Sequence, residues 1–513
     1  MIATLRSQKF QYGWNKIKLE DNLINQKLFD ILSGYTEDIP DFLRLLKDYQ
    51  LPSVVFGPMD HLRLLRQLLS IILIFKDSLD DEETHEQLCA FSHKILAIPY
   101  WHEFQLISFY VHFCKFLLKE DEGSDFNLVQ NENGSILLEY GCHLSWAGIV
   151  QQPFLAELGT LLALYGEISQ DPLILKQADL VCKWQKLMLD CNGIPVHGLF
   201  SQEKHGSMLS SLAWNYLLFA TVGTFLEKNE FLIIAKRQQD HFKKNSDLFS
   251  SNLPLIFGVL ENFIHQNDLF FDLEEVGLFS QIDHFVHDSD HALVGVRSQK
   301  ITSISTTLGG KTGLGAYLLN PYLGVVTFGP QQLPFDDCDG FGIESAQWLQ
   351  KKFNSGITQI TPTGYSIKGF AKLTNNKFSI EHYATFGNSK HSEDWIDITQ
   401  ILNNSKLDIQ IAFLTFKSTE VFSFTFYVKA STCKINQQIL IKSKSLEKYS
   451  GDVAFIECIN EEKRFTITPH FNVGTMEIIP LTGGNDFWSG DFLIGFSISD
   501  TTLRYNWTLE TDD

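Results

Sequence analysis

The stretch Gln281–Ile301, with the sequence QIDHFVHDSDHALVGVRSQKI, separates two kinds of sequence pattern. Before it, apolar residues recur every three or four positions, as in Leu62–Phe75, which is the period of a buried helix face. After it, apolar and polar residues alternate, as in Phe422–Ser431, which is the period of a β-strand. We therefore predict a multidomain α+β protein, with a helical domain over residues 1–275 and a large antiparallel β-sandwich over residues 280–513.

The helical half contains a weak internal repeat. Residues 161–188 align with a segment 57 positions later, so that Gly166 matches Gly223 and Leu175 matches Leu232. Repeated helical hairpins of this length indicate a stack or a ring of helix pairs. We predict an α/α toroid, an incomplete ring of helical hairpins. An open solenoid of the HEAT type is the structural alternative.

The β half carries alternating runs such as Gln438–Lys444 and Arg464–Phe471. Clusters of turn-forming residues separate them, among them Thr361–Gly364, 375–376 and 403–404. Short strands and turns over more than 200 residues predict a large antiparallel sandwich.

Length, net charge and composition limit the number of domains and the classes of partner that the chain can have. A length of 513 residues exceeds a single compact domain, so two domains are expected. A formal net charge of −20 excludes nucleic acid and anionic membranes as partners, since both require a basic surface. The negative net charge and the scarcity of arginine also fit poorly with a polyanionic sugar as substrate, since arginine is the residue best suited to bind carboxylate and sulfate groups.

Cysteines and apolar segments bear on the compartment. The 8 cysteines lie far apart without a C-x-x-C pair, which favours buried free thiols. Residues 1–18 have no apolar core of signal-peptide length. The run Leu62–Phe75 is short and contains Arg63 and Arg66, which favours a buried helix over a membrane span. We expect a soluble, cytoplasmic protein, unless a leader was removed or export follows a non-classical route.

The boundary stretch also resembles a known family. Ile282–His287 and Val296–Ile301 are similar to the "MDR-x-VHR…W-x-x-x-x-x-x-S-x-RI" opening of the β domain in polysaccharide lyases of the hyaluronate/chondroitin AC type. A helical toroid followed by a large sandwich is also the arrangement of the heparinase II/III lyases. The resemblance implies this fold and an oligo- or polysaccharide partner. No cofactor is predicted.

Lyases of this kind cleave uronic-acid polymers by β-elimination. One group neutralises the uronate carboxylate, a base removes the C5 proton, and an acid, usually tyrosine, protonates the departing glycosidic oxygen. Residues His143–Pro153 resemble the family's "N-W-W…E-I-G-x-P" segment, with Ser145 where asparagine is expected, followed by Trp146. The simpler interpretation is that Trp146 packs the start of a helix.

A second matching place begins at Gly198 and resembles the family's "DGSF-x-x-H…Y-G" region. It supplies His205 as base or carboxylate contact, with His197 as a second candidate base. Trp214 stands where the acid tyrosine is expected, and Tyr216 follows it, a turn of about 200° away on a helix. We therefore predict His205, Tyr216 and His197 as catalytic residues. The predicted substrate-binding residues are Ser145, Trp146, Trp214, Asn215, Glu203 and Arg297.

Two alternatives to a lyase stay open. One is a catalytically inactive carbohydrate-binding or structural protein on the same fold. The other is a glycoside hydrolase with two carboxylates flanking the scissile bond, for which Glu203, Asp190 and Glu157 are candidates.

Two clusters have the composition of metal sites. His284 and His287 are three positions apart, and residues with that spacing on a strand point to opposite faces. We therefore favour a β-hairpin that turns at 288–290 over a metal site formed by His284, His287 and His291. Asp337 and Asp339 fit no complete calcium-loop pattern, which favours an acidic turn. No metal is predicted.

Overall fold

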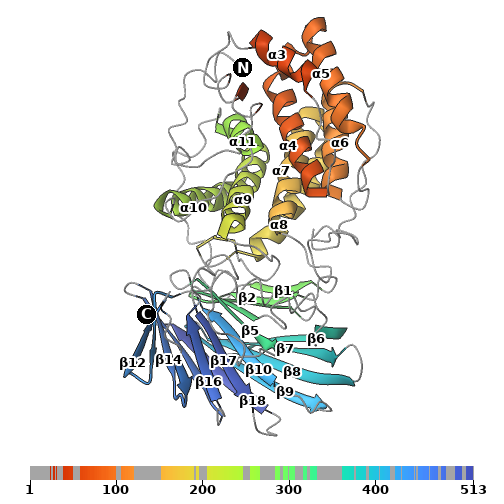
Figure 1. Cartoon of the computed structure of the whole chain (residues 1–513). Helices are drawn as coiled ribbons and strands as arrows, with labels where there is room; N and C mark the ends of the chain where they lie inside the picture. Colours follow the sequence, from red (N-terminus) through yellow and green to blue (C-terminus); the bar gives the residue numbers. More distant parts are fainter. Residues whose placement is uncertain are drawn as a thin grey trace. The chain divides into compact units, whose positions relative to one another are not determined.

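Figure 1 shows the computed structural model of the chain. The helical residues and their connections that the structure describes are 24, 27, 28, 31, 39–49, 58–99, 105–120, 152–189, 192–195, 205–245 and 255–265. The described residues of the β part are 284–288, 293–297, 300–306, 316–320, 324–331, 361–374, 377–388, 392–403, 405–415, 422–428, 430–443, 445, 449–460, 463–471, 475–480, 492–498 and 504–511.

The first half of the chain is helical. Its described elements are α3 (Ile39–Asp48), α4 (Pro58–Ile74), the 3₁₀ turn η3 (Lys76–Ser78), α5 (Glu82–Leu96), α6 (Gln105–Leu117), α7 (Gln152–Ser169), α8 (Pro172–Leu187), α9 (His205–Phe225), α10 (Asn229–Asn245) and α11 (Leu255–His265). Helix α5 begins where the Asp81 carboxylate accepts a hydrogen bond from the Thr84 N–H at 2.9 Å. That hydrogen bond lowers the pKa of Asp81.

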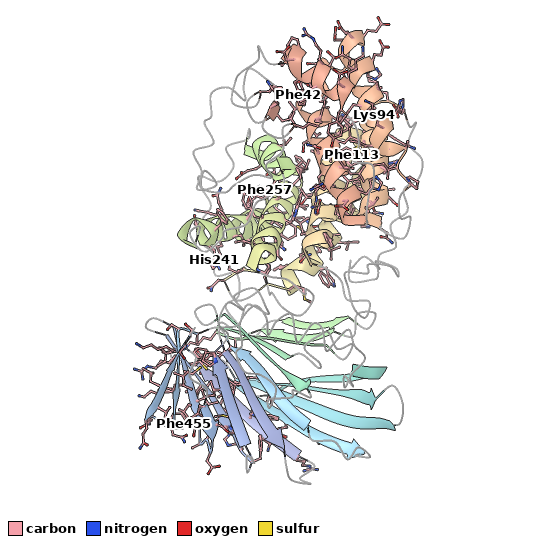
Figure 2. All side chains as sticks on the ribbon, viewed as in Figure 1. Phe42, Lys94, Phe113, His241, Phe257 and Phe455 are labelled. Carbon is pink, nitrogen blue, oxygen red and sulfur yellow. The ribbon has the colours of Figure 1, made fainter. Side chains whose placement is uncertain are left out.

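The apolar run Leu62–Phe75 forms α4 and is buried, as predicted. Leu65, Leu68 and Ile72 have no exposed surface, whereas Arg63 lies on the exposed side of the helix. Aromatic rings fill the space between neighbouring helices: Phe113 of α6 lies in this core (Figure 2). Burial of such apolar faces supplies most of the stability of helices of this length.

The internal repeat is confirmed by a recurring close contact. A Cβ atom on Gly166 of α7 would lie 2.9 Å from Leu175 Cγ, and one on Gly223 of α9 would lie 2.9 Å from Leu232 Cγ. Each glycine thus lets a helix approach the first turn of the helix that follows it. The same pair of residue types makes the same contact 57 positions apart, so the two hairpins share one packing geometry.

The two hairpins also turn in the same way. Gln170 and Glu227 adopt φ angles of 57° and 53°, the left-handed conformation of a helix C-cap. The N–H of the residue after each donates to the carbonyl of Gly166 or Gly223, at 2.9 and 2.8 Å. Both connections are Schellman motifs, so the repeat extends to the backbone of the turn.

Among the described helices, five contact one another in a closed sequence. Helix α4 contacts α6 and α11, and α6 contacts α7. Helix α7 meets α9 at Gly159, where a Cβ would lie 2.8 Å from Leu218 Cδ1. Helix α9 meets α11 where the Trp214 ring lies edge-on to Phe257, with 6.4 Å between ring centroids. The contacts therefore run from α4 through α6, α7, α9 and α11 back to α4.

The second half of the chain is antiparallel β-structure. Its described strands are β1 (His284–Asp288), β2 (Leu293–Arg297), β3 (Thr302–Thr306), β4 (Ala316–Asn320), β5 (Gly324–Gln331), β6 (Thr361–Thr374), β7 (Lys377–Asn388), β8 (Ser392–Asn403), β9 (Lys406–Thr415), β10 (Phe422–Val428), β11 (Thr432–Ile435), β12 (Ile439–Lys442), β13 (Tyr449–Gly451), β14 (Ile456–Asn460), β15 (Lys463–Pro469), β16 (Thr475–Pro480), β17 (Phe492–Ile498) and β18 (Arg504–Thr511). The alternating runs of the sequence coincide with β10, β12 and β15, as predicted.

Within these strands the structure has two nine-stranded sheets. One has the order β1-β2-β3-β4-β5-β10-β17-β16-β13, and the other has the order β12-β11-β14-β15-β18-β9-β8-β7-β6. Alternate residues are buried in two strands with described side chains, Phe465 and Ile467 of β15 and Met476 and Ile478 of β16, so each of these strands has one covered side. The helices and sheets together confirm the α+β class.

The boundary stretch forms the predicted hairpin. Strands β1 and β2 pair antiparallel, with His284 opposite Arg297 and Asp288 opposite Leu293. By internal contacts the chain divides into two compact units: Met1–His143, Gln152–Gln185 and Leu209–Glu275 form the first, and the remainder forms the second.

One predicted turn is wrong. Residues Thr361–Gly364 belong to strand β6, where the register to β7 shifts between Pro362 and Gly364. A β-bulge accommodates proline and glycine within a strand, which explains why turn-forming residues occur there. The predicted turn at 375–376 lies between β6 and β7, whereas Asn403 of the second predicted turn is the last residue of β8 and pairs with Lys406.

Candidate functional site

His205 is the first residue of α9, the helix that also carries Trp214, Asn215 and Tyr216. Its backbone is described and its side chain is not. Five of the other candidates upstream of α9 lie outside the described residues: His197, Ser145, Trp146, Glu203 and Asp190.

The structure does not bring His205 and Tyr216 together. Both belong to the continuous helix α9 and are 11 residues apart. At 1.5 Å per residue their backbones are about 16 Å apart along the helix axis. A base and an acid that act on neighbouring atoms of one sugar residue must lie much closer than that.

Tyr216 is buried, with 1% of its surface exposed. Its hydroxyl donates to Glu261 Oε1 of α11 at 3.5 Å and accepts from Gln239 Nε2 of α10 at 3.4 Å. Its ring also lies 6.4 Å from the ring of Phe257. The residue therefore joins α9 to two neighbouring helices.

Trp214 and Asn215 are buried as well. The Asn215 amide donates to Ser211 O within α9 at 3.0 Å. Trp214 and Tyr216 both contact Phe257, although the helix turns about 200° between them. Helix α9 is apolar around most of its circumference, so neighbouring helices cover it on several sides. For this reason Trp214 and Tyr216 can contact the same neighbour although they lie on different sides of the helix.

A charged cluster that the sequence did not reveal lies in the helical unit. Arg66 of α4 donates to both carboxylate oxygens of Glu157 of α7, from Nε at 2.7 Å and from Nη2 at 2.5 Å. Tyr110 of α6 donates to Glu157 Oε1 at 2.5 Å. The Arg66 guanidinium also lies over the Trp214 ring, 5.9 Å from its centroid. These residues, Arg66, Tyr110, Glu157 and Trp214, are called the ring cluster below.

The ring cluster links four helices of the closed contact sequence. Burial by itself lowers the pKa of Arg66, but the charge of Glu157 and its hydrogen bonds outweigh burial and raise that pKa. Burial and the Glu157 charge together raise the pKa of Tyr110 well above its ordinary value. Arg66 is thus held charged and Tyr110 protonated.

This geometry corrects one alternative. Glu157, a candidate carboxylate for glycoside hydrolysis, has no exposed surface and accepts hydrogen bonds from both Arg66 and Tyr110. It therefore has no access to a glycosidic bond. One signal was available in the sequence: Arg66 follows Leu62 by four positions and precedes Leu69 by three, which puts a charge on the buried face of α4.

Two histidines of the boundary hairpin, His284 and His287, belong to strand β1. His284 and His287 lie three positions apart on β1, opposite Arg297 and Val294 in the register with β2. No cluster of metal-ligating side chains occurs in the part of the chain that the structure describes. His291, Asp337 and Asp339 fall outside it, and only the backbone of Arg297 is described.

None of the described helices combines the length and apolarity that a membrane span requires.

Comparisons with known proteins give distant likenesses. No family model matches the chain, and a search of curated proteins finds no match. Among solved structures, a chondroitin AC lyase variant from Streptomyces coelicolor A3 is 10% identical, with a TM-score of 0.47, over 95% of this chain and 74% of the lyase. The same lyase in complex with chondroitin sulphate is 8% identical, with a TM-score of 0.45 over the same shares.

A 4-α-glucanotransferase from Thermococcus litoralis is also similar, at 8% identity and a TM-score of 0.30, over 92% of this chain. The chain spans 60% of the length of that enzyme. At these identities and TM-scores the function has to be inferred from the residues of the chain itself.

Proposed function

We propose that the chain is a carbohydrate-active protein that cleaves a uronic-acid-containing glycan by β-elimination. The observation that carries the proposal is the position of His205 as the first residue of α9. In the sequence, this residue is the histidine of the segment from Gly198 that resembles the histidine region of the hyaluronate-type lyases.

The proposal includes the fold. The closed sequence of helix contacts from α4 to α11 is interpreted as the inner ring of an α/α toroid over residues 1–275. The two nine-stranded sheets found among the described strands are interpreted as the β-sandwich over residues 280–513. Repeated hairpins with identical turn geometry support a ring built from one supersecondary unit.

The start of α9 suits a uronate. The unpaired N–H groups of a helix's first turn and its dipole favour an anion at this end. A uronate carboxylate bound there becomes a better electron sink, which makes the C5 proton more acidic. His205 then serves as the base or the carboxylate contact, with His197 as the second candidate base.

Tyr216 takes a structural role in this proposal. Its hydroxyl lies between Glu261 and Gln239, and about 16 Å of helix separates its backbone from that of His205. The acid that protonates the leaving oxygen is therefore another group or water. Ser145 and Trp146 remain the proposed substrate contacts, as the resemblance implies.

The test is a search for the unsaturated uronate product. Oligosaccharides of hyaluronan, chondroitin, heparan and alginate are incubated with the chain, and near-ultraviolet absorbance is followed. A signal that His205→Ala abolishes supports the proposal. The matched control is His93→Ala, because the His93 side chain is 65% exposed on α5 and belongs to no predicted site.

Other outcomes separate the alternatives. Release of reducing ends without the chromophore indicates a hydrolase, and glycan binding without any product indicates a non-catalytic protein. If Tyr216→Phe removes activity while thermal unfolding is unchanged, its structural role is refuted and the acid role returns. If no glycan binds or reacts, the proposal fails.

A further inference from the structure

Two cysteines face each other across neighbouring strands of the second sheet. Cys433 of β11 is directly opposite Cys458 of β14 in the antiparallel register. Their sulfur atoms lie 3.9 Å apart, and both residues have no exposed surface. The two cysteines are 25 positions apart in the sequence, and the pairing of β11 with β14 brings them together.

The backbone between them has the geometry that a disulfide requires. The Asn436 N–H donates to Phe455 O at 3.2 Å, which makes that pair a hydrogen-bonded position of the ladder. Positions alternate along an antiparallel pair, so Cys433 and Cys458, three positions further, occupy a non-hydrogen-bonded position. Cα atoms of such a pair lie about 4.5 Å apart, within the range that disulfides span.

The side chains also point the same way. Cys433 and Ile435 are the buried residues of β11, and Ile456 and Cys458 are those of β14. Both sulfurs therefore lie on the covered face of one sheet. A bonded S–S distance is about 2.05 Å, so rotation about the Cα–Cβ bonds is enough to join them without a backbone shift.

We propose that Cys433 and Cys458 are a site of oxidative modification that closes into a disulfide. The two thiols lose two protons and two electrons and form one S–S bond. An oxidant of the disulfide class, such as oxidised glutathione, accepts the electrons and protons and leaves as two thiols. The reaction proceeds through a mixed disulfide on one cysteine, which the other cysteine resolves.

Access to the buried thiols comes from the edge of the sheet. Strand β12 is the edge strand and β11 is next to it, and each has 4 residues. Short strands at a sheet edge open locally at low cost, which exposes the thiols to a small oxidant.

The bond would join two neighbouring strands of one sheet and close a loop that includes a strand of the other sheet. The segment between the cysteines contains β12 of the same sheet and β13, which pairs with β16 in the other sheet. Closing this loop limits how far β13 can separate from β11 and β14 in the unfolded chain. The oxidised form is therefore expected to unfold at a higher temperature than the reduced form.

The experiment uses the full-length chain incubated with oxidised glutathione, with and without a low concentration of urea that promotes local opening. Two readouts follow: the number of thiols that react after full denaturation, and a peptide map under non-reducing conditions. The expected result is a fall of two reactive thiols and one linked peptide pair that joins Cys433 to Cys458. Reduction should restore both thiols and lower the unfolding temperature again.

The variants separate this pair from the other cysteines. Cys433→Ala and Cys458→Ala should each prevent the linked peptide and the shift in unfolding temperature. The matched control is Cys182→Ala, because Cys182 is also buried but has its sulfur next to Leu218 O at 3.8 Å. If the wild-type chain retains all its thiols under every condition, or links a different pair, the proposal is refuted; this outcome is independent of any activity on glycans.

Discussion

Replacing Glu157 by glutamine is expected to destabilise the helical unit strongly. The carboxylate has no exposed surface and accepts two hydrogen bonds from Arg66 and one from Tyr110. Glutamine keeps the size of the side chain but has only one acceptor oxygen. Its NH₂ group, a hydrogen-bond donor, would face the donor groups of Arg66 or Tyr110. Arg66 would then retain its charge, with 13% of its side chain exposed and no compensating anion from Glu157.

The magnitude follows from the loss of one partner of a buried ion pair. Removing one charge from such a pair costs about 3–5 kcal/mol, because the remaining charge stays desolvated. Tyr110→Phe removes a single hydrogen bond to a charged group and is expected to cost about 1.5–3 kcal/mol. Glu157→Gln should therefore lower the free energy of unfolding more than Tyr110→Phe does.

The assay is urea unfolding followed by the far-ultraviolet circular dichroism of the helices. The control is a triple variant, Arg66→Met, Tyr110→Phe and Glu157→Leu, which replaces the polar groups together by apolar ones. Such replacements are often neutral or stabilising, so the triple variant should be more stable than Glu157→Gln alone. A cost below about 1 kcal/mol for Glu157→Gln would refute the reasoning, since it would mean that the pair is solvated or dispensable.

Three further changes test other parts of the structure. Gly166→Ala should destabilise the hairpin by about 1–3 kcal/mol in thermal unfolding, because the new Cβ would lie 3.0 Å from the backbone nitrogen of Leu175; equal or greater stability would contradict the close approach. Burial lowers the pKa of His61 below 6.5, so the unfolded chain binds the proton more readily and stability falls as the pH drops below about 6.5. His61→Gln should weaken this dependence in thermal unfolding measured across that pH range, and an unchanged dependence would contradict the reasoning. Asn436→Ala should lower the free energy of unfolding in urea by about 1 kcal/mol, because φ there is 48° and the side chain accepts a hydrogen bond from the Ala454 N–H. Asn436→Gly also loses the hydrogen bond but adopts this φ without strain, so it should cost less. A larger cost for Asn436→Gly than for Asn436→Ala would contradict the role of backbone strain.

Local patterns in the sequence predicted the elements well. Apolar spacing of three and four located α4, because a helix buried along one face repeats with that period. The alignment of Gly166 with Gly223 predicted a repeated hairpin, and the structure shows the same glycine–leucine contact in both. These features depend on residues close together in the chain.

Local patterns failed where a bulge or a distant partner decides the outcome. The turn expected at Thr361–Gly364 is part of β6, because pairing with β7 absorbs the irregular residues. Tyr216, expected as an acid, lies buried against α10 and α11. Nothing in its neighbouring sequence specifies which helices cover it.

The sequence by itself determined the class of the protein: helical hairpins before Gln281–Ile301 and antiparallel strands after it, since hydrophobic periodicity and turn residues are properties of short segments. Only the tertiary structure decided which residues meet. Arg66 finds Glu157 across 91 positions, and Cys433 finds Cys458 across 25, through helix packing in one case and strand register in the other. Such pairings depend on how whole elements bury their apolar faces, and no local pattern encodes them.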